Sequence, residues 1–346
     1  MLKEMKNVTF KNDTKKIWKE FKYKQISIWI AGYDKTNIFN VLTKHFGSEK
    51  SINLTRIKVI LNNLDGNFSI VCIAKNFVFA AVDCIRSYPL FWSKIGNKII
   101  ISSNSNNILS DKNIVDKDQL LAFRMSGYTI DEGSLWRNVY NIKAGNFIFI
   151  DNKFDVFKAR FFLYDPWHEK KIPDHILKKN LKKEIFKLLK NVIKKANGRN
   201  IVIPLSAGLD SRLIVSGLKY LNYDKVKCFS YGLKNNFESV AAKKIAKHLG
   251  YSWEYVEINQ KTAKKFYRSE LHQNFLINTI DGCSTPSIQG FYAINKLLKN
   301  KYITQNDIII NGNSGDFISG GHLPKFEKNE LKNLKIKLLD KLLEKH

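Results

Sequence analysis

The segment Ser-Ala-Gly-Leu-Asp-Ser at residues 206–211 brings hydroxyl, backbone amide and carboxylate groups into one short turn. It follows an apolar run at residues 201–205, which is typical of a buried strand, and helical spacing begins at Leu213. Amides at the start of a helix lack partners within the helix and point towards an anion, and small residues allow a phosphate to come close. The pattern therefore predicts a phosphate-binding turn.

The side chains of this turn suit a phosphate that is accompanied by a metal ion. Ser206 and Ser211 add hydroxyl donors. Asp210 is anionic and would repel a bare phosphate, but its carboxylate is a suitable ligand for a bridging Mg²⁺. The candidate cofactor-binding residues are Leu205, Ser206, Ala207, Gly208, Leu209, Asp210 and Ser211.

The elements around this turn alternate between strand and helix. An amphipathic helix is predicted over residues 176–193, followed by the strand and helix that flank the turn, a strand at 226–232, a helix at 237–249 and a strand at 253–258. Such alternation predicts a doubly wound parallel sheet, whose ligands lie at the carboxyl ends of the strands. The residues that end the second strand, Phe229, Ser230, Tyr231 and Gly232, are then expected to contact an adenine.

The first half of the chain shows a different pattern. Residues 24–31, 68–74 and 77–82 read as short strands with turn signals between them, and residues 34–46 read as a short helix. We expect an antiparallel β-rich domain. The boundary is expected within residues 160–173, where two prolines end regular structure.

Residues 206–211 resemble the pyrophosphate-binding loop, S-G-G-x-D-S, of the ATP pyrophosphatases (PP-loop enzymes). Those enzymes cleave ATP between the α- and β-phosphates and adenylylate their substrate, so the resemblance implies ATP and Mg²⁺ as cofactors. Ala207 stands where glycine is usual, which matters if that position needs a positive φ.

A second resemblance lies upstream of the loop. Residues 64–68 and 82–92, Leu-Asp-Gly-Asn-Phe and Val-Asp-Cys-Ile-Arg-Ser-Tyr-Pro-Leu-Phe-Trp, resemble the class II glutamine amidotransferase domain that precedes the PP-loop domain in asparagine synthetases. The resemblance implies residues 1–165 as an amidotransferase-like domain of the Ntn-hydrolase type. Residues 170–346 would form an asparagine synthetase-like ATP pyrophosphatase domain of the adenine nucleotide α-hydrolase type, shortened at its C-terminus.

Residues 307–321 form the second segment with candidate site residues, and here an apolar strand leads into a glycine-rich turn. The stretch resembles the L-S-G-x-G-[SA]-D-E-x-F-G-G segment of asparagine synthetases, and it adds Asn313, Ser314 and Gly315 to the candidate cofactor-binding residues. The matching aspartate in that family helps to bind Mg²⁺, so the resemblance implies that Asp316 shares one ion with Asp210. The alternative is that Asp316 caps the following turn.

The chain departs from this family in its candidate catalytic groups. The family's glutaminase uses a cysteine at residue 2 as nucleophile, whereas residue 2 here is leucine, and Cys72 reads as a small core residue. We therefore expect residues 1–165 to lack glutaminase activity, as in the β-lactam synthetase branch. Residues 329–346 predict an amphipathic terminal helix, and no motif assigns a catalytic lysine.

The expected function is an AMP-forming, ATP-dependent ligase that joins a small-molecule carboxylate to ammonia or an amine. The alternative is a catalytically weak nucleotide-binding pseudoenzyme or partner subunit, and a homodimer or an outside source of ammonia is left open. The net charge of +27 is spread along the chain without a basic block, so nucleic acid is not expected as a partner. With no apolar leader or span and no paired cysteine motif, we expect a cytoplasmic protein without membrane attachment.

Overall fold

The computed structural model describes residue 5 and residues 7–12, 17–46, 53–109, 114–165, 172–313 and 315. The chain folds into two compact units, one of residues 1–170 with 273–286 and the other of residues 171–272 with 287–346. The first unit therefore includes a short segment from the second half of the chain. Among the described helices, none has both the length and the apolarity to cross a membrane.

The first unit is built on a 6-stranded sheet with the order β10-β9-β5-β4-β3-β2, in which every neighbouring pair is antiparallel. Its strands are β2 (Trp18–Tyr23), β3 (Ile26–Gly32), β4 (Phe68–Ile73), β5 (Val78–Val82), β9 (Asn146–Ile150) and β10 (Val156–Arg160). The predicted strands 68–74 and 77–82 are confirmed as the β4–β5 hairpin.

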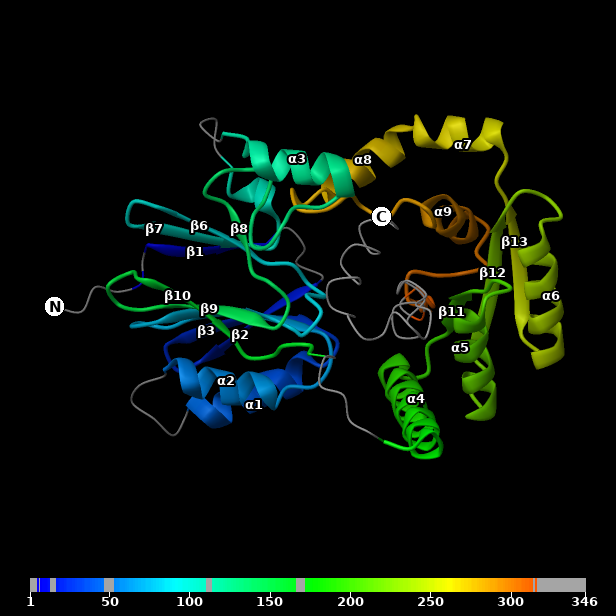
Figure 1. Ribbon diagram of the computed structural model, residues 1–346, viewed down its shortest axis with the longest axis horizontal. Coiled ribbons are helices and arrows are strands. Elements are labelled where there is room, and N and C mark those ends of the chain that lie inside the picture. The colour runs from blue at the N-terminus through cyan, green and yellow to red at the C-terminus, as the bar shows by residue number, and fades with distance from the viewer. Residues whose placement is uncertain are drawn as a thin grey trace, which may run out of the picture. The chain divides into compact units, whose positions relative to one another are not determined.

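A 4-stranded sheet with the order β1-β7-β6-β8 packs on one face of the larger sheet (Figure 1). Its strands are β1 (Val8–Lys11), β6 (Phe91–Ile95), β7 (Lys98–Ser102) and β8 (Tyr140–Asn141). The sequence predicted an antiparallel β-rich domain, and this was incomplete, because β1 pairs with β7 in parallel and the strands divide between two sheets. Sheet membership is set by long-range pairing, which the local pattern of a strand does not encode.

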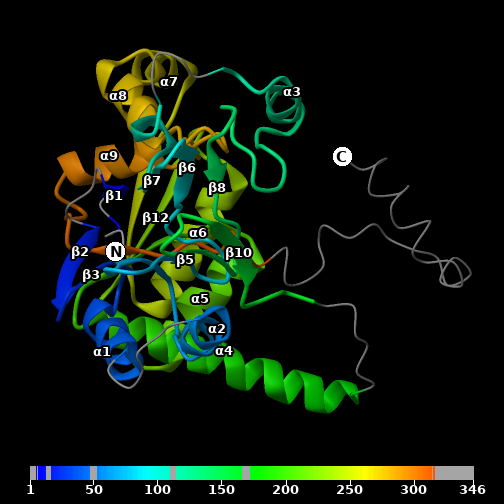
Figure 2. The ribbon, with the colours of Figure 1, turned by 90° about the vertical axis from the view of Figure 1, so that its left-hand side faces the viewer.

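Helices cover the other face of the 6-stranded sheet. Figures 1 and 2 both show α1 (Lys35–Phe46) and α2 (Leu54–Asn62) on the side away from the 4-stranded sheet. Because successive side chains of a strand point to opposite faces, Val71 joins the core between the sheets while its neighbours Ile70 and Cys72 pack under the helices. Cys72 is thus a small core residue, as predicted. The first half of the chain also contributes the short 3₁₀ helix η1 (Ser105–Asn107) and α3 (Lys117–Ser126) to this unit.

The second unit contains a 4-stranded sheet with the order β13-β12-β11-β14. Its strands are β11 (Ile201–Pro204), β12 (Val226–Gly232), β13 (Ser252–Glu257) and β14 (Ile308–Ile309), and all neighbours are parallel. The prediction of a parallel sheet is confirmed, and the helix predicted over 237–249 is α6 (Phe237–Leu249).

Both faces of this parallel sheet are covered by helices. On one face, α4 (Asp174–Ala196), α5 (Leu209–Tyr220) and α6 pack through residues such as Leu189, Val215 and Ala242. On the other face, α9 (Phe291–Lys299) packs through Ala293 and Leu297. Helices on both faces require the chain to cross over the sheet in both directions, which is the doubly wound arrangement. The remaining helix of this unit is α7 (Gln260–Tyr267), whereas α8 (Glu270–Thr279) begins in this unit and belongs to the first unit from residue 273 onwards.

Candidate functional site

The strand order of the second unit defines where a ligand is expected. From β11 the chain moves to β12 and then to β13 on one side, whereas β14 pairs with the opposite edge of β11. Connections that leave neighbouring strands in opposite directions open a crevice at the carboxyl ends of those strands. Residues 205–211 follow β11 and residues 310–315 follow β14, so both motifs lie at this switch point.

The turn after β11 is organised by its two serines. The Ser206 amide donates to Ser211 Oγ at 3.2 Å, the two hydroxyl oxygens lie 3.2 Å apart, and the Gly208 amide donates to Ser206 Oγ at 3.0 Å. The Leu205 amide donates to the Phe229 carbonyl at 2.8 Å, which joins the turn to the end of β12. The turn is therefore tied to the sheet before any ligand binds.

Helix α5 begins at Leu209, earlier than the helical spacing from Leu213 predicted. Asp210 and Ser211 consequently lie in the first helical turn, where a negative charge interacts favourably with the helix dipole. Gly208 is the N-cap and makes no side-chain cap. Among the described residues, the amides of Leu209 and Asp210 make no hydrogen bond, so they can donate to an anion.

The turn after β14 packs directly on this helix start. A Cβ atom added to Gly312 would lie 2.8 Å from Asp210 Cβ and 2.9 Å from the Ser211 amide nitrogen. A Cβ atom on Gly315 would overlap the Asp210 carboxylate. Glycine at these two positions is thus what allows the motifs, about a hundred residues apart in sequence, to meet at Asp210.

The alanine that replaces the usual glycine of the loop is accommodated without strain. Ala207 is not among the residues with positive φ, so the position does not require a glycine backbone. Alanine at residue 207, in place of the usual glycine, is therefore compatible with the backbone conformation of the loop.

The residues that end β12 are placed differently from one another. The Phe229 side chain is buried in the core with Val202 and Val256. Ser230 is also buried, where its hydroxyl donates to the Leu205 carbonyl at 2.7 Å and accepts from Trp253 Nε1 at 3.0 Å. A ligand at this edge would meet Tyr231 and Gly232, which are partly exposed, and the backbone rather than the side chains of the other two.

A polar cluster that the sequence did not single out fixes the position of β14. Asp307 accepts from Asn200 Nδ2 at 2.9 Å and from the Thr304 amide at 3.1 Å, and it pairs with Lys227 at 3.4 Å. Burial opposes ionisation of this carboxyl, but the hydrogen bonds and the charge of Lys227 outweigh it and hold the Asp307 pKa below its ordinary value. The partners of Asp307 come from distant segments of the chain, so no local pattern in the sequence indicates this cluster.

Two of the predicted site residues, Ser314 and Asp316, lie outside the described residues, as does the helix predicted over residues 329–346. Within the described ranges there is no group of three or more histidine, cysteine, aspartate or glutamate side chains that could hold a metal ion. The candidate metal ligand that the structure does describe is Asp210, whose carboxylate lies directly against Gly315.

A separate hollow of about 420 Å³ lies in the first unit, lined by residues that include Asp131 and Glu132. These carboxylates are already paired, Asp131 with Lys143 at 2.6 Å and Glu132 with Lys158 at 2.5 Å. The unpaired amides of the α5 start make the switch point the better candidate for an anionic ligand.

Comparison with known proteins agrees with the arrangement of these motifs. Residues 194–345, which contain both turns, match the asparagine synthase family model. This part of the chain is therefore similar to the asparagine synthase family. The match begins in the last turn of α4 and continues through the β11 and β14 turns.

Full-length relatives in the asparagine synthase family extend the similarity to the first unit. The chain is 24% identical over 265 residues to a Methanocaldococcus jannaschii protein provisionally named asparagine synthetase (glutamine-hydrolysing) 2, covering 72% of this chain and 48% of that protein. It is 22% identical over 338 residues to the asparagine synthetase (glutamine-hydrolysing) of Gallus gallus, covering 88% of this chain and 55% of that protein. The chain thus spans about half the length of the curated relatives it matches.

Among solved structures, the NH3-dependent NAD synthetase of Campylobacter jejuni aligns with 41% of this chain and 59% of its own, at 16% identity and a TM-score of 0.29. A TM-score of this size carries no argument about the fold. The similarity to the asparagine synthase family rests on the family model and the sequence relatives.

Proposed function

We propose that this chain is an ATP-dependent, AMP-forming ligase that joins a small-molecule carboxylate to ammonia or an amine. The observation that carries the proposal is the meeting of the β11 and β14 turns at Asp210, because it places amide donors, serine hydroxyls and a carboxylate at the switch point of a parallel sheet. The relatives named asparagine synthetase support the same class of reaction.

In the proposed reaction an oxygen of the substrate carboxylate attacks the α-phosphorus of ATP, and the bond to the β-phosphate oxygen breaks. The amides of Leu209 and Asp210 and the hydroxyls of Ser206 and Ser211 would hold the departing pyrophosphate, where preorganised donors stabilise developing charge. The nitrogen of the amine then attacks the acyl carbon, AMP leaves with the former carboxylate oxygen, and the nitrogen loses a proton. The adenine would lie against Tyr231 and Gly232.

Mg²⁺ fits this arrangement as a cofactor. Magnesium sites on nucleotides use one or two protein carboxylates and complete their coordination with water and phosphate. Asp210, whose carboxylate lies against Gly315, provides one such carboxylate, and Asp316 is proposed as the other. The ion would neutralise the charge of the pyrophosphate, which two aspartates would otherwise repel.

We also propose that residues 1–165 keep an amidotransferase-like fold of the Ntn-hydrolase type without glutaminase chemistry. Nucleophilic cysteines require thiolate character and access. Burial strongly raises the pKa of the Cys72 thiol, and burial together with the charge of Asp83 raises the pKa of Cys84. Neither environment favours a thiolate.

Nucleotide binding and turnover can be tested on the purified chain. ATP affinity is measured with and without Mg²⁺ for the wild type and for Asp210→Asn, which keeps the shape of the side chain but removes its charge. We expect the variant to lose the Mg²⁺-dependent part of the affinity and to keep its thermal stability. Equal Mg²⁺ dependence in both proteins would remove Asp210 from the site.

Pyrophosphate exchange into ATP then separates a ligase from a nucleotide-binding pseudoenzyme. Exchange requires reversible adenylylation, so it should appear when a panel of small carboxylates is supplied and should be lost in Asp210→Asn. ATP binding without exchange for any carboxylate would favour the pseudoenzyme.

A further inference from the structure

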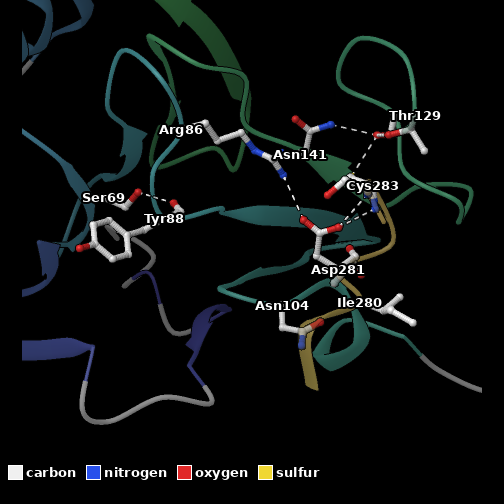
Figure 3. Close-up of polar contacts among 12 residues, drawn as sticks. Ser69, Arg86, Tyr88, Asn104, Thr129, Asn141, Ile280, Asp281 and Cys283 are labelled. Carbon is white, nitrogen blue, oxygen red and sulfur yellow. Dashed lines mark hydrogen bonds and ion pairs between the residues drawn. The ribbon is translucent and has the colours of Figure 1, made fainter. Parts of the chain in front are cut away.

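Residues 280–286 come from the second half of the sequence but belong to the first unit. Figure 3 shows Asp281 of this segment joined by a dashed line to Arg86. Residues 280–286 follow α8 and form no strand of their own, apart from an isolated bridge between Ser284 and Tyr128. The first unit contacts them along the backbone in the way that a domain contacts a bound peptide.

Backbone hydrogen bonds hold this segment along its length. The Leu135 amide donates to the Gly282 carbonyl and the Thr129 amide donates to the Cys283 carbonyl, each at 2.8 Å. The Thr285 amide donates to the Gly127 carbonyl at 2.9 Å. These contacts do not depend on side-chain identity, so something else must set the register of the segment.

Asp281 is the side chain that shapes the segment from within. Its Oδ1 accepts from the amides of Cys283 at 2.8 Å and Ser284 at 3.0 Å, which closes a tight turn at Gly282, where φ is +74°. Its other carboxylate oxygen, Oδ2, faces Arg86 Nη2 at 3.9 Å. The side chains of Arg86 and Asp281 are 22% and 17% exposed, so the pair is largely shielded from solvent screening.

Arg86 is placed for this contact at a local cost. Its backbone has a φ of +56°, which is unfavourable for a residue with a Cβ atom. The guanidinium lies over the Phe91 ring at 5.4 Å, and its Nε and Nη2 atoms are buried without a hydrogen-bond partner among the described residues. Nε and Nη2 form one edge of the guanidinium, the edge that carboxylates bind in a bidentate manner.

We propose that the first unit binds residues 280–286 as an internal ligand, and that Arg86 is the positioning residue that orients Asp281. By holding Oδ2, Arg86 keeps Oδ1 directed at the two amides of the turn, so that the Gly282 and Cys283 carbonyls meet Leu135 and Thr129. This role is independent of ATP, because every contact in it lies within the first unit.

Cys283 provides a direct readout of this docking. Its side chain is buried with Phe91, Ile108 and Val139, and it loses that protection if the segment leaves the unit. Cys72 and Cys228 are fully buried in the cores of the two units and report global opening instead, whereas Cys84 is exposed. Replacing Cys84 with serine leaves three buried thiols whose alkylation rates can be followed by mass spectrometry.

The experiment compares Arg86→Gly, Arg86→Lys and Asp281→Asn in the full-length Cys84→Ser chain. Glycine suits the positive φ, so Arg86→Gly removes the guanidinium without adding backbone strain. Arg124→Ala, at an exposed arginine in α3 of the same unit, is the matched control. Alkylation of Cys283 should become roughly tenfold faster in Arg86→Gly and Asp281→Asn, the size expected for a lost contact to a charged group. Arg86→Lys should lie between them and the wild type.

The rates of Cys72 and Cys228 should stay unchanged, and the Arg86→Gly/Asp281→Asn double variant should be little faster than either single variant, since one shared contact is broken. A Cys283 rate within about twofold of wild type in Arg86→Gly, or in Asp281→Asn, would overturn the proposal, since the contact between the two side chains would then not be holding the turn. An equal acceleration of Cys72 or Cys228 would overturn it too, because the effect would then be global. Asp281→Asn and Arg86→Lys keep the comparison valid if the glycine variant does not fold.

Discussion

Replacing Gly312 with alanine tests whether the turns after β11 and β14 form one site. The added methyl group would lie 2.8 Å from Asp210 Cβ, 2.9 Å from the Ser211 amide nitrogen and 3.1 Å from the Asp210 carbonyl carbon. Comfortable contacts between carbon atoms are about 3.5–4.0 Å, so the two contacts with Asp210 carbon atoms are too short by at least about 0.7 Å and 0.4 Å. The obstructing atoms belong to the first turn of α5 and cannot rotate away.

Relief therefore requires one turn to move away from the other. Overpacking of this kind costs about 1–3 kcal/mol. If ATP binding needs the two turns together, the same free energy is lost from binding, which corresponds to a decrease in affinity of roughly 5-fold to 150-fold. The stability of the second unit should change less, because β14 remains paired with β11 through Ile308 and Ile309.

The assay is Mg²⁺-dependent ATP binding by calorimetry, together with thermal unfolding of the same samples. Gly290→Ala is the matched control, since the added Cβ would approach nothing closer than Ile294 Cδ1 at 3.8 Å. Gly290→Ala should bind ATP like the wild type. If Gly312→Ala also binds ATP with wild-type affinity and unfolds at the same temperature, the close approach at Asp210 plays no part in the site and the reasoning fails.

Three other changes test separate parts of the second unit. The Ser206→Ala/Ser211→Ala variant should bind ATP at least about tenfold more weakly, because two hydroxyl donors are lost, and unchanged affinity would place the nucleotide elsewhere. Asp307→Asn should lower the free energy of unfolding at pH 7 by about 1–3 kcal/mol. The pKa of Asp307 in the folded protein is below its ordinary 3.8, so the stability that the ionised carboxylate contributes is fully present above pH 3.8 and is lost as the pH falls through the folded-state pKa. The difference in the free energy of urea unfolding between wild type and Asp307→Asn should therefore be smaller at pH 3 than at pH 7. Gly217→Ala should change the free energy of unfolding of the second unit by less than about 1 kcal/mol, because its methyl group meets only the rotatable Cδ1 end of Leu189 in α4 and alanine is favoured over glycine inside a helix; a larger loss in denaturant unfolding would show that Leu189 cannot move aside.

Local patterns in the sequence determined most elements of the second unit. Residues 226–232 and 237–249 form β12 and α6 as their apolar spacing and their flanking glycines predicted. When strands alternate with helices, each helix crosses over the sheet to the start of the next strand, so neighbouring strands run parallel. The parallel arrangement therefore followed from the order of the elements. The same local reasoning predicted the β4–β5 hairpin and the burial of Cys72.

Contacts between distant segments were decided by the tertiary structure. The sequence predicted that residues 206–211 and 307–321 would lie at one edge, but the packing of Gly312 and Gly315 on Asp210 depends on β14 pairing with β11 rather than extending the sheet beyond β13. Which edge a strand joins is set by long-range side-chain packing and by the Asp307 cluster, and neither appears in the periodicity of the strand itself.

The first unit shows the same division. Short alternating runs predicted strands, but not that β1 would pair in parallel with β7 or that the strands would form two sheets. Nor did the sequence indicate that residues 280–286 would dock on this unit, because Arg86 and Asp281 meet across nearly two hundred residues. The spacing of apolar residues and the residue types of turns act over a few residues, so they can be read from the sequence. Which distant segments pair with each other depends on which surfaces remain to be buried after the chain has collapsed.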